Sequence, residues 1–309
     1  MTEQAPPDED SRCLLLVLSH DELGVIVDGL ADPLQPVVAV ALSSTCLGLR
    51  TPLRAALQVL KERHARAVVL CRKVETSCAV LRGAEYQPQR LLWLNKGLTT
   101  ADMATLAMIL RTIGLPRLWE LSLGFNRFGD AGVQALCEGL DQGVAPSLRI
   151  LSLFGNKIGR AGAEALAAAL RRGAMPKLEE LHLGLSPVGK TDVAALAATL
   201  RKLPALKTLS LSSCGIGDEG VASLVADLGK DAFKALKEVY LDGNSITDAG
   251  CATLVSAIDG GRMPRIEWIY GLPLFGRAGS GLHANSASSV AARRAVSDAV
   301  SRAKARRSS

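Results

Sequence analysis

The chain has 309 residues, of which 48% are hydrophobic, 4% aromatic and 21% charged, with a net charge of +6. Aliphatic side chains can therefore build a sizeable core, which excludes a largely disordered chain. No apolar run approaches the roughly 18 residues that signal a membrane span, so we expect no membrane partner.

The N-terminal residues and the cysteines bear on the cellular compartment. Residues 1–12 (MTEQAPPDEDSR) are acidic and contain Pro, so we expect them to be disordered and not to act as a secretory signal. The seven cysteines are odd in number and lack a Cys-x-x-Cys spacing, which is typical of reduced thiols. We therefore expect a cytoplasmic protein, with the nucleus as the alternative.

Residues 13–83 predict a separate all-α unit. Apolar residues recur there at helical spacing, and the pattern is interrupted at Pro33 and Pro36. A further basic, amphipathic helix is predicted over residues 52–70.

The spacing of Leu18, Glu22-Leu23, Ile26, Leu30 and Cys46 in the first part of this unit resembles that of an F-box. Ser19 replaces the usual Pro of that family, and Leu49 stands where an aromatic residue is common. The resemblance implies docking to a Skp1-type adaptor of a ubiquitin ligase through five residues: Leu18, Leu23, Ile26, Leu30 and Cys46. The alternative is a helical cap that seals the region that follows, and both can hold at once.

Residues 84–275 contain an internal repeat, which is the strongest signal in the chain. Five consecutive copies begin with the pattern L-x-x-[LV]-x-L-x-x-[NSC]-x-[FIV] and lie 28 or 30 residues apart. A weaker copy precedes them and places Leu98 30 residues before Phe128, and an eroded copy begins at Ile266.

Each copy combines two periodicities. Leu121 and Leu123 alternate with Ser122, which predicts a short strand with one buried face. Val133 and Leu136 belong to the apolar stripe of a following helix. Because such a unit buries its faces only against its neighbours, the copies predict an α/β solenoid with parallel strands on the concave side and helices on the convex side.

Two residue types recur where these helices begin. Asp130, Asp218 and Asp248 are predicted to cap their own helices. Glycines in the first turn are expected to allow close packing; they are Gly132, Gly162, Gly220 and Gly250.

The repeated pattern is similar to the leucine-rich repeat family, in its ribonuclease-inhibitor-type subclass, over about residues 88–275 and six to seven copies. In that family an Asn side chain caps backbone groups inside each turn. The corresponding residues are Asn126, Asn156, Ser186, Cys214 and Asn244. Ser186 departs from the family pattern, so we expect a weaker turn there.

Residues 276–309 are expected to form a loop followed by a basic terminal helix or tail. Residues 271–309 hold seven Lys or Arg and one Asp, so the net charge of the chain lies there and residues 1–270 are neutral overall. We expect the repeat to fail after Leu274. The terminal KARR is either a solvated end or a nuclear-import or nucleic-acid patch, and no specific nucleic-acid partner is expected.

Motifs of catalysis, metal binding and cofactor binding do not occur in the sequence, so we expect neither an enzyme nor a cofactor. The four histidines lie far apart, and Cys71 and Cys78 do not have a zinc spacing. His182 lies near Ser152 and Ser210 of adjacent predicted strands, where we expect an exposed contact residue.

The predicted concave face is the candidate ligand-binding surface. Its candidate residues, with those of the adjoining loops, are Glu120, Phe125, Phe154, His182, Ser210, Glu238, Tyr240, Asp242, Trp268 and Tyr270. Exposed aromatic residues beside charges are where binding energy concentrates. For Trp268 and Tyr270 the alternative is packing under the terminal helix. Ser122 and Ser210 are predicted to face solvent.

The expected function is a non-catalytic protein–protein interaction scaffold that recognises a protein ligand, in particular as an F-box-type substrate-recognition subunit of a ubiquitin ligase. One alternative is a GTPase-activating protein of the Ran-activator type, although those proteins end in an acidic tail and this chain ends basic. The other is a ribonuclease-inhibitor-like protein, which would need a more acidic concave face.

Overall fold

The computed structural model describes residues 32–45, 47–82, 90–226, 232–272, 285 and 288–308. The chain divides into two compact units, Met1–Glu85 and Tyr86–Ser309. The F-box-like residues lie outside the described residues; they are Leu18, Leu23, Ile26, Leu30 and Cys46. Residues 1–12, expected to be disordered, also lie outside them.

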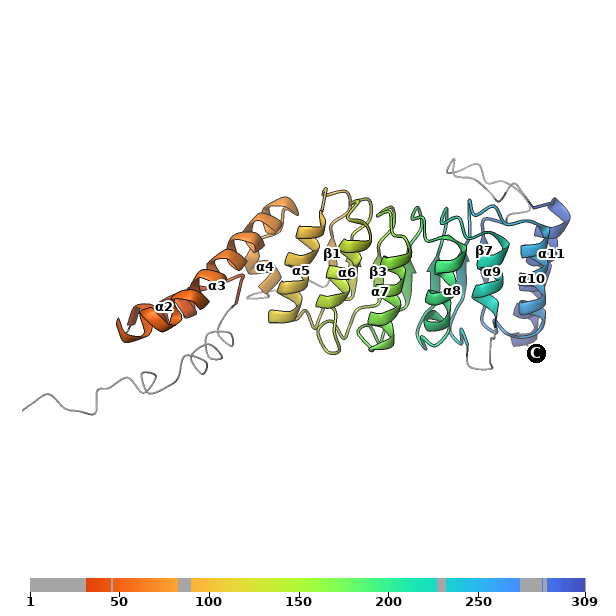
Figure 1. Ribbon diagram of the computed structural model, residues 1–309. Helices are drawn as coiled ribbons and strands as arrows, with labels where there is room; N and C mark the ends of the chain where they lie inside the picture. Colours follow the sequence, from red (N-terminus) through yellow and green to blue (C-terminus); the bar gives the residue numbers. More distant parts are fainter. Residues whose placement is uncertain are drawn as a thin grey trace, which may run out of the picture. The chain divides into compact units, whose positions relative to one another are not determined.

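The first unit contains the helices α2 (Val37–Thr45), α3 (Leu47–Lys73) and α4 (Cys78–Arg82) (Figure 1). The side chain of Leu60 in α3 packs on Ala39 in α2, and both are buried. The predicted start of the long helix at residue 52 is wrong, since α3 begins five residues earlier. Pro is common at helix starts, but here Pro52 lies inside α3, where it leaves one backbone hydrogen bond of the helix unformed.

Three cysteine thiols of the two units are held protonated by their surroundings. Burial raises the pKa of Cys71, Cys137 and Cys214 to about 12. The Sγ atoms of Cys71 and Cys78 lie 3.0 Å apart, and both thiols are free. Because a neutral thiol is a weak nucleophile, these side chains act as packing residues at neutral pH.

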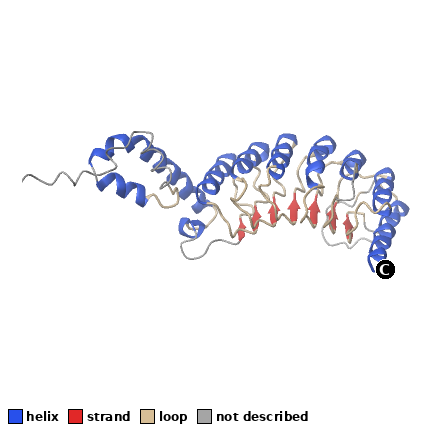
Figure 2. Ribbon diagram, turned by 90° about the horizontal axis from the view of Figure 1, so that it is seen from below, coloured by secondary structure: helices blue, strands red, loops and turns tan. Residues whose placement is uncertain are grey.

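The second unit is built from a seven-stranded parallel sheet whose strands follow the order of the chain (Figure 2). The strands are β1 (Arg90–Leu92), β2 (Glu120–Ser122), β3 (Ile150–Ser152), β4 (Glu180–His182), β5 (Thr208–Ser210), β6 (Glu238–Tyr240) and β7 (Trp268–Tyr270). Equivalent residues of the repeats lie opposite each other, as Leu121 does with Leu151.

Helices follow the strands one by one and cover the outer side of the sheet (Figures 1 and 2). They are α5 (Thr100–Ile113), α6 (Gly129–Gly139), α7 (Arg160–Arg171), α8 (Gly189–Leu200), α9 (Gly217–Val225), α10 (Asp248–Asp259) and α11 (Val290–Ser308). The predicted α/β solenoid, with strands on the concave side and helices on the convex side, is confirmed.

The core of this unit lies between the sheet and the helices. Leu121 and Leu123 of the second repeat are fully buried there, and so are Val133 and Leu136 of α6. Gly162 allows this close packing, because a Cβ atom at that position would lie 2.6 Å from the Asp130 carboxylate of the preceding repeat. The stack therefore depends on contacts between consecutive repeats.

Buried asparagines connect each turn to the preceding one. The Oδ1 atom of Asn156 accepts hydrogen bonds from the backbone N–H groups of Asn126 and Arg127, both at 2.9 Å. Its Nδ2 atom donates to the carbonyl oxygens of Leu123 at 2.8 Å and Leu153 at 3.0 Å. We call this row of side chains the asparagine ladder. It satisfies backbone groups that would otherwise be buried without partners.

The ladder is interrupted in the middle of the sheet. The Ser186 hydroxyl is buried and makes no hydrogen bond among the described residues. Cys214 keeps its place in the ladder: its Sγ atom donates to the carbonyl oxygens of Leu183 at 3.5 Å and Ser212 at 3.6 Å, and accepts from the backbone N–H of Ser186. Because Ser186 is too short to reach the preceding turn, the predicted weakness of this turn has a structural cause.

The regular spacing of the repeat ends at Leu274, but the asparagine ladder continues beyond it. The Oδ1 atom of Asn285 accepts hydrogen bonds from the N–H groups of Asn244 at 2.8 Å and Ile246 at 3.1 Å. Asn285 therefore occupies the next place in the asparagine ladder, 41 residues after Asn244 instead of 30. The helix α11 then takes the place of a repeat helix beside α10 (Figure 1).

The predicted helix caps are wrong in a consistent way. Asp130 accepts a hydrogen bond from the backbone N–H of Gly159 at 2.6 Å, and Gly159 precedes the helix of the next repeat. Asp218 bonds Thr247 in the same manner, and Asp248 bonds Ser289. These carboxylates therefore join consecutive helix starts, because the stacking brings the next helix start within their reach.

Candidate functional site

The candidate site is the concave face, which consists of the outward-facing side chains of β1–β7 and of the turns directly after these strands. It encloses a concavity of about 850 Å³. Of the residues predicted to bind a ligand, seven line this concavity: Glu120, Phe154, His182, Ser210, Tyr240, Asp242 and Tyr270. Three others lie on the same sheet or its turns without lining it: Phe125, Glu238 and Trp268.

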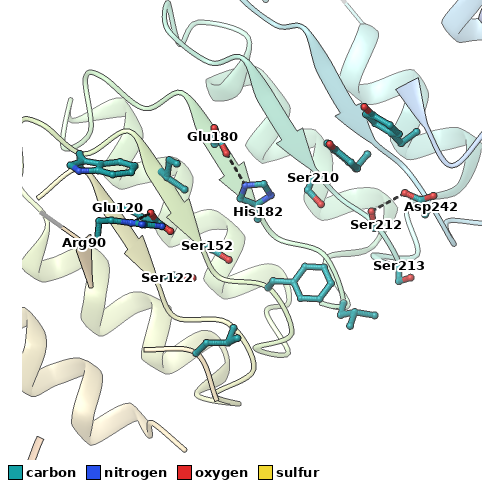
Figure 3. Close-up of a pocket in the computed structure, with 17 residues that line it drawn as sticks. Arg90, Glu120, Ser122, Ser152, Glu180, His182, Ser210, Ser212, Ser213 and Asp242 are labelled. Carbon is teal, nitrogen blue, oxygen red and sulfur yellow. Dashed lines mark hydrogen bonds and ion pairs between the residues drawn. The ribbon is translucent and has the colours of Figure 1, made fainter. Parts of the chain in front are cut away.

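Small polar side chains occupy the centre of the concave face. Figure 3 shows Ser122, Ser152 and Ser210 with His182 on four neighbouring strands. The Nε2 atom of His182 lies 3.3 Å from the Glu180 carboxylate. Among the described residues His182 makes no hydrogen bond to a serine hydroxyl, so the geometry gives a polar contact surface and not an assembled nucleophile and base.

The predicted solvent exposure of Ser210 is wrong. Its side chain is only 6% exposed, whereas Ser122 is half-buried. The strand register places Ser210 between the larger side chains of His182 and Tyr240, which cover it. The neighbouring repeats, not the position within the strand, decide this exposure.

Aromatic residues gather at the β6–β7 end. Tyr240 and Tyr270 stack with ring centroids 4.2 Å apart, and the Tyr240 hydroxyl donates to Glu238 at 3.1 Å. Burial and this carboxylate raise the pKa of the Tyr240 phenol. Trp268 is 53% exposed, and the Nζ atom of Lys304 from α11 lies 3.9 Å from its ring centroid. The terminal helix therefore contacts this end but leaves much of Trp268 uncovered.

The basic terminal helix is anchored to the last repeats. The guanidinium groups of Arg302 and Arg306 bind the Asp259 carboxylate at 2.7 and 3.0 Å. Arg307 donates to the carbonyl oxygen of Ile266 at 3.2 Å. Several arginines of the basic terminal helix therefore bind other residues of the same chain.

Three residues of the β1 end were missed by the sequence analysis. The Arg90 guanidinium lies 2.6 Å from the Glu120 carboxylate and 5.2 Å from the ring centroid of Trp119, and Leu94 lines the same concavity. Extending the repeat alignment through the weak first copy would have found Arg90 and Leu94, because they are 30 residues before Glu120 and Gly124.

Apolar side chains form one border of the concave face at this end. We call Leu94, Phe125, Phe154 and Leu185 the apolar rim. Leu94 lies over Gly124, and Phe154 lies over Gly124 and Gly184. The rings of Phe125 and Phe154 meet edge to face, with centroids 5.3 Å apart. Gly124 and Gly184, which follow β2 and β4, are therefore covered by neighbouring residues and do not form open surface on the concave face.

The turns that carry the rim have left-handed backbone. The position of Phe125, with φ 58°, has this conformation in other repeats too, where Asn95, Gly155, Ser213 and Gly243 occupy it. Leu185 occupies the same position with φ 53°. A bulky side chain in this region costs about 1–3 kcal/mol, which Gly or Asn would largely avoid.

Within the described part of the chain, no helix is both long and apolar enough to cross a membrane. Nor do three or more His, Cys, Asp or Glu side chains of these residues gather into a group that could hold a metal ion.

Comparison with known protein families agrees with the repeat. A family described as "Leucine Rich repeat" matches residues 118–137, 144–167 and 202–225. A chain in the crystal structure of the yeast Rad7 and Elc1 complex is similar at 15% identity, with a TM-score of 0.30, over 55% of this chain and 52% of that one. This chain thus spans about half the length of that neighbour. The matched residues of the second unit therefore have the pattern of leucine-rich repeats.

Proposed function

We propose that the protein is a non-catalytic scaffold whose concave face recognises a protein ligand. The observation that carries this proposal is the concavity of about 850 Å³, lined by polar, aromatic and apolar side chains from all seven strands and their turns. Such mixed surfaces with exposed aromatic residues are typical of protein interfaces.

The size of the sheet limits how a ligand can bind. Seven strands at ~4.8 Å span roughly 30 Å, and each strand presents about 10–13 Å of length. The projected face is therefore on the order of 300–450 Å², whereas a standard interface takes about 800 Å² from each partner. A tightly bound protein ligand has to contact the turns as well as the strands.

The test is affinity purification from native extract with mass spectrometry, followed by binding measurements with the ligands found. We expect Ser152→Arg, in the centre of the concave face, to weaken binding at least about tenfold, because the long charged side chain would project into the concavity where a ligand lies. Gln134→Arg, on the exposed face of α6, is the matched control and should change binding less than about twofold. Equal binding by both variants would refute the concave face as the site.

We further propose that the N-terminal segment docks to a Skp1-type adaptor, which would make the protein a substrate-recognition subunit of a ubiquitin ligase. The support is the F-box-like spacing of Leu18, Leu23, Ile26, Leu30 and Cys46.

We expect the double substitution Leu23→Asp and Ile26→Asp in the full chain to abolish copurification of such an adaptor, since charges replace the apolar docking residues. Val69→Asp, at an exposed residue of α3, serves as the control. An adaptor that is absent from the wild-type sample, or retained by the double variant, would leave the segment as a cap alone.

A further inference from the structure

We propose that the apolar rim, with the cations Arg127 and Lys157, binds a protein segment in which an aromatic or aliphatic side chain lies close to a carboxylate. This inference rests on the proposed function, because it names the class of ligand for one end of the concave face. Three observations support it: exposed apolar side chains, left-handed backbone that carries large residues, and exposed positive charges. They occur together in the neighbouring turns that contain Arg127 and Lys157.

The rim is a continuous apolar surface that the protein leaves open. Leu94 and Phe125 are 52% and 45% exposed. Leu94 lies over Gly124, which the backbone carbonyl of Phe154 also approaches, and Phe125 lies over Gly155 and against the edge of Phe154. Large side chains that remain this exposed and touch one another are typical of interaction sites.

The backbone of these turns does not require such side chains. Phe125 and Leu185 occupy a left-handed position that smaller residues fill in other repeats: Asn95, Gly155, Ser213 and Gly243. Two residues later, a second left-handed position holds Gly97, Gly215 and Ser245 in other repeats, but Arg127 and Lys157 beside the rim. Because glycine makes the same turn without strain, the contribution of the larger side chains lies outside the turn.

The charges beside the rim select the ligand. Arg127 and Lys157 are exposed and lie in consecutive turns, two residues after Phe125 and Gly155. No carboxylate among the residues that the structure describes pairs with either side chain. A ligand carboxylate can therefore bind them without breaking an existing ion pair, while its apolar neighbour contacts the rim.

A second copy of the chain fits this surface poorly. A symmetric contact through the rim would bring the Arg127 and Lys157 side chains of both copies together, and like charges in contact are unfavourable. The acidic residues 1–12 of the chain have a suitable charge, so the experiment has to separate them from an external ligand.

The experiment screens a displayed library of random peptides against the full-length protein. Enriched peptides are then synthesised and their Kd measured by fluorescence anisotropy against four variants. Phe125→Gly removes the central rim side chain, and Arg127→Gly with Lys157→Gly removes both charges. Ser245→Gly is the matched control, since Ser245 has φ 57° at the far end of the sheet. Ser152→Arg, in the centre of the concave face, tests the proposed function itself.

We expect the enriched peptides to combine a Leu or an aromatic residue with a nearby Asp or Glu. Phe125→Gly should weaken their binding at least about tenfold. The double glycine variant should weaken it about tenfold and remove most of its salt dependence. Ser245→Gly should change Kd less than about twofold, and the glycine variants should melt no lower than the wild type, because glycine relieves the left-handed positions.

Other outcomes overturn the inference. The rim would be refuted if the enriched peptides carried no carboxylate, or if the rim variants bound them as tightly as Ser245→Gly does. The proposed function would still stand in that case, provided that Ser152→Arg blocks binding. If Ser152→Arg weakened the binding of none of the enriched peptides, the result would count against both the rim and the concave face as ligand-binding sites. Peptides that bind only after removal of residues 1–12 would identify that segment as the occupant. Dimers that Phe125→Gly dissociates in sedimentation velocity would identify a second copy.

Discussion

Replacing Asn156 with alanine is expected to lower the free energy of unfolding by about 3–5 kcal/mol, because its side chain bonds four backbone groups in two consecutive turns. Alanine would leave the N–H of Asn126 and the carbonyl of Leu153 without these partners in the interior of the stack. Each buried group without a hydrogen bond costs about 1–3 kcal/mol. Urea unfolding followed by far-ultraviolet circular dichroism measures the difference.

The matched control is Ser186→Ala, at the place where the asparagine ladder is interrupted. The Ser186 hydroxyl is buried without a hydrogen-bond partner among the described residues, so its removal should change the free energy of unfolding by less than about 0.5 kcal/mol. If the Asn156 and Ser186 variants unfolded at the same urea concentration, the asparagine ladder would not be a source of stability.

Truncation of the buried strand residues has the other large expected effect. Leu123→Ala or Leu153→Ala should each lower the free energy of unfolding by about 2–5 kcal/mol, because removal of a buried Leu side chain loses apolar burial and leaves a cavity. Both side chains are fully buried between the sheet and the helices. The same urea unfolding measurement applies to both.

Ser122→Ala is the appropriate control for this pair, since Ser122 belongs to the same strand as Leu121 but faces the concavity. We expect it to cost less than about 0.5 kcal/mol. Ser210→Ala is a less suitable control, because Ser210 is covered by its neighbours. Equal losses for Leu123→Ala and Ser122→Ala would mean that the assignment of inward and outward residues is wrong.

Most of the fold follows from the spacing of apolar residues. The 28- or 30-residue repeat of strand and helix patterns predicts a parallel stack, and the alternation at Leu121, Ser122 and Leu123 predicts which side chains are buried. These predictions succeed because both are local properties: a strand has a period of two residues, and each helix has one apolar stripe. The position of most candidate binding residues on the concave face follows from the same alternation.

Contacts between repeats required the tertiary structure. Asn285 continues the asparagine ladder although the spacing of the repeat is broken, and Asp130 bonds the start of the next helix instead of its own. The apolar rim arises in the same way, since Phe154 covers glycines of the strands on either side. In each case the partner lies about 30 residues or more away, and its distance depends on how tightly the repeats stack. The pattern of apolar residues within one repeat cannot specify that distance. The packing of one repeat on the next determines it.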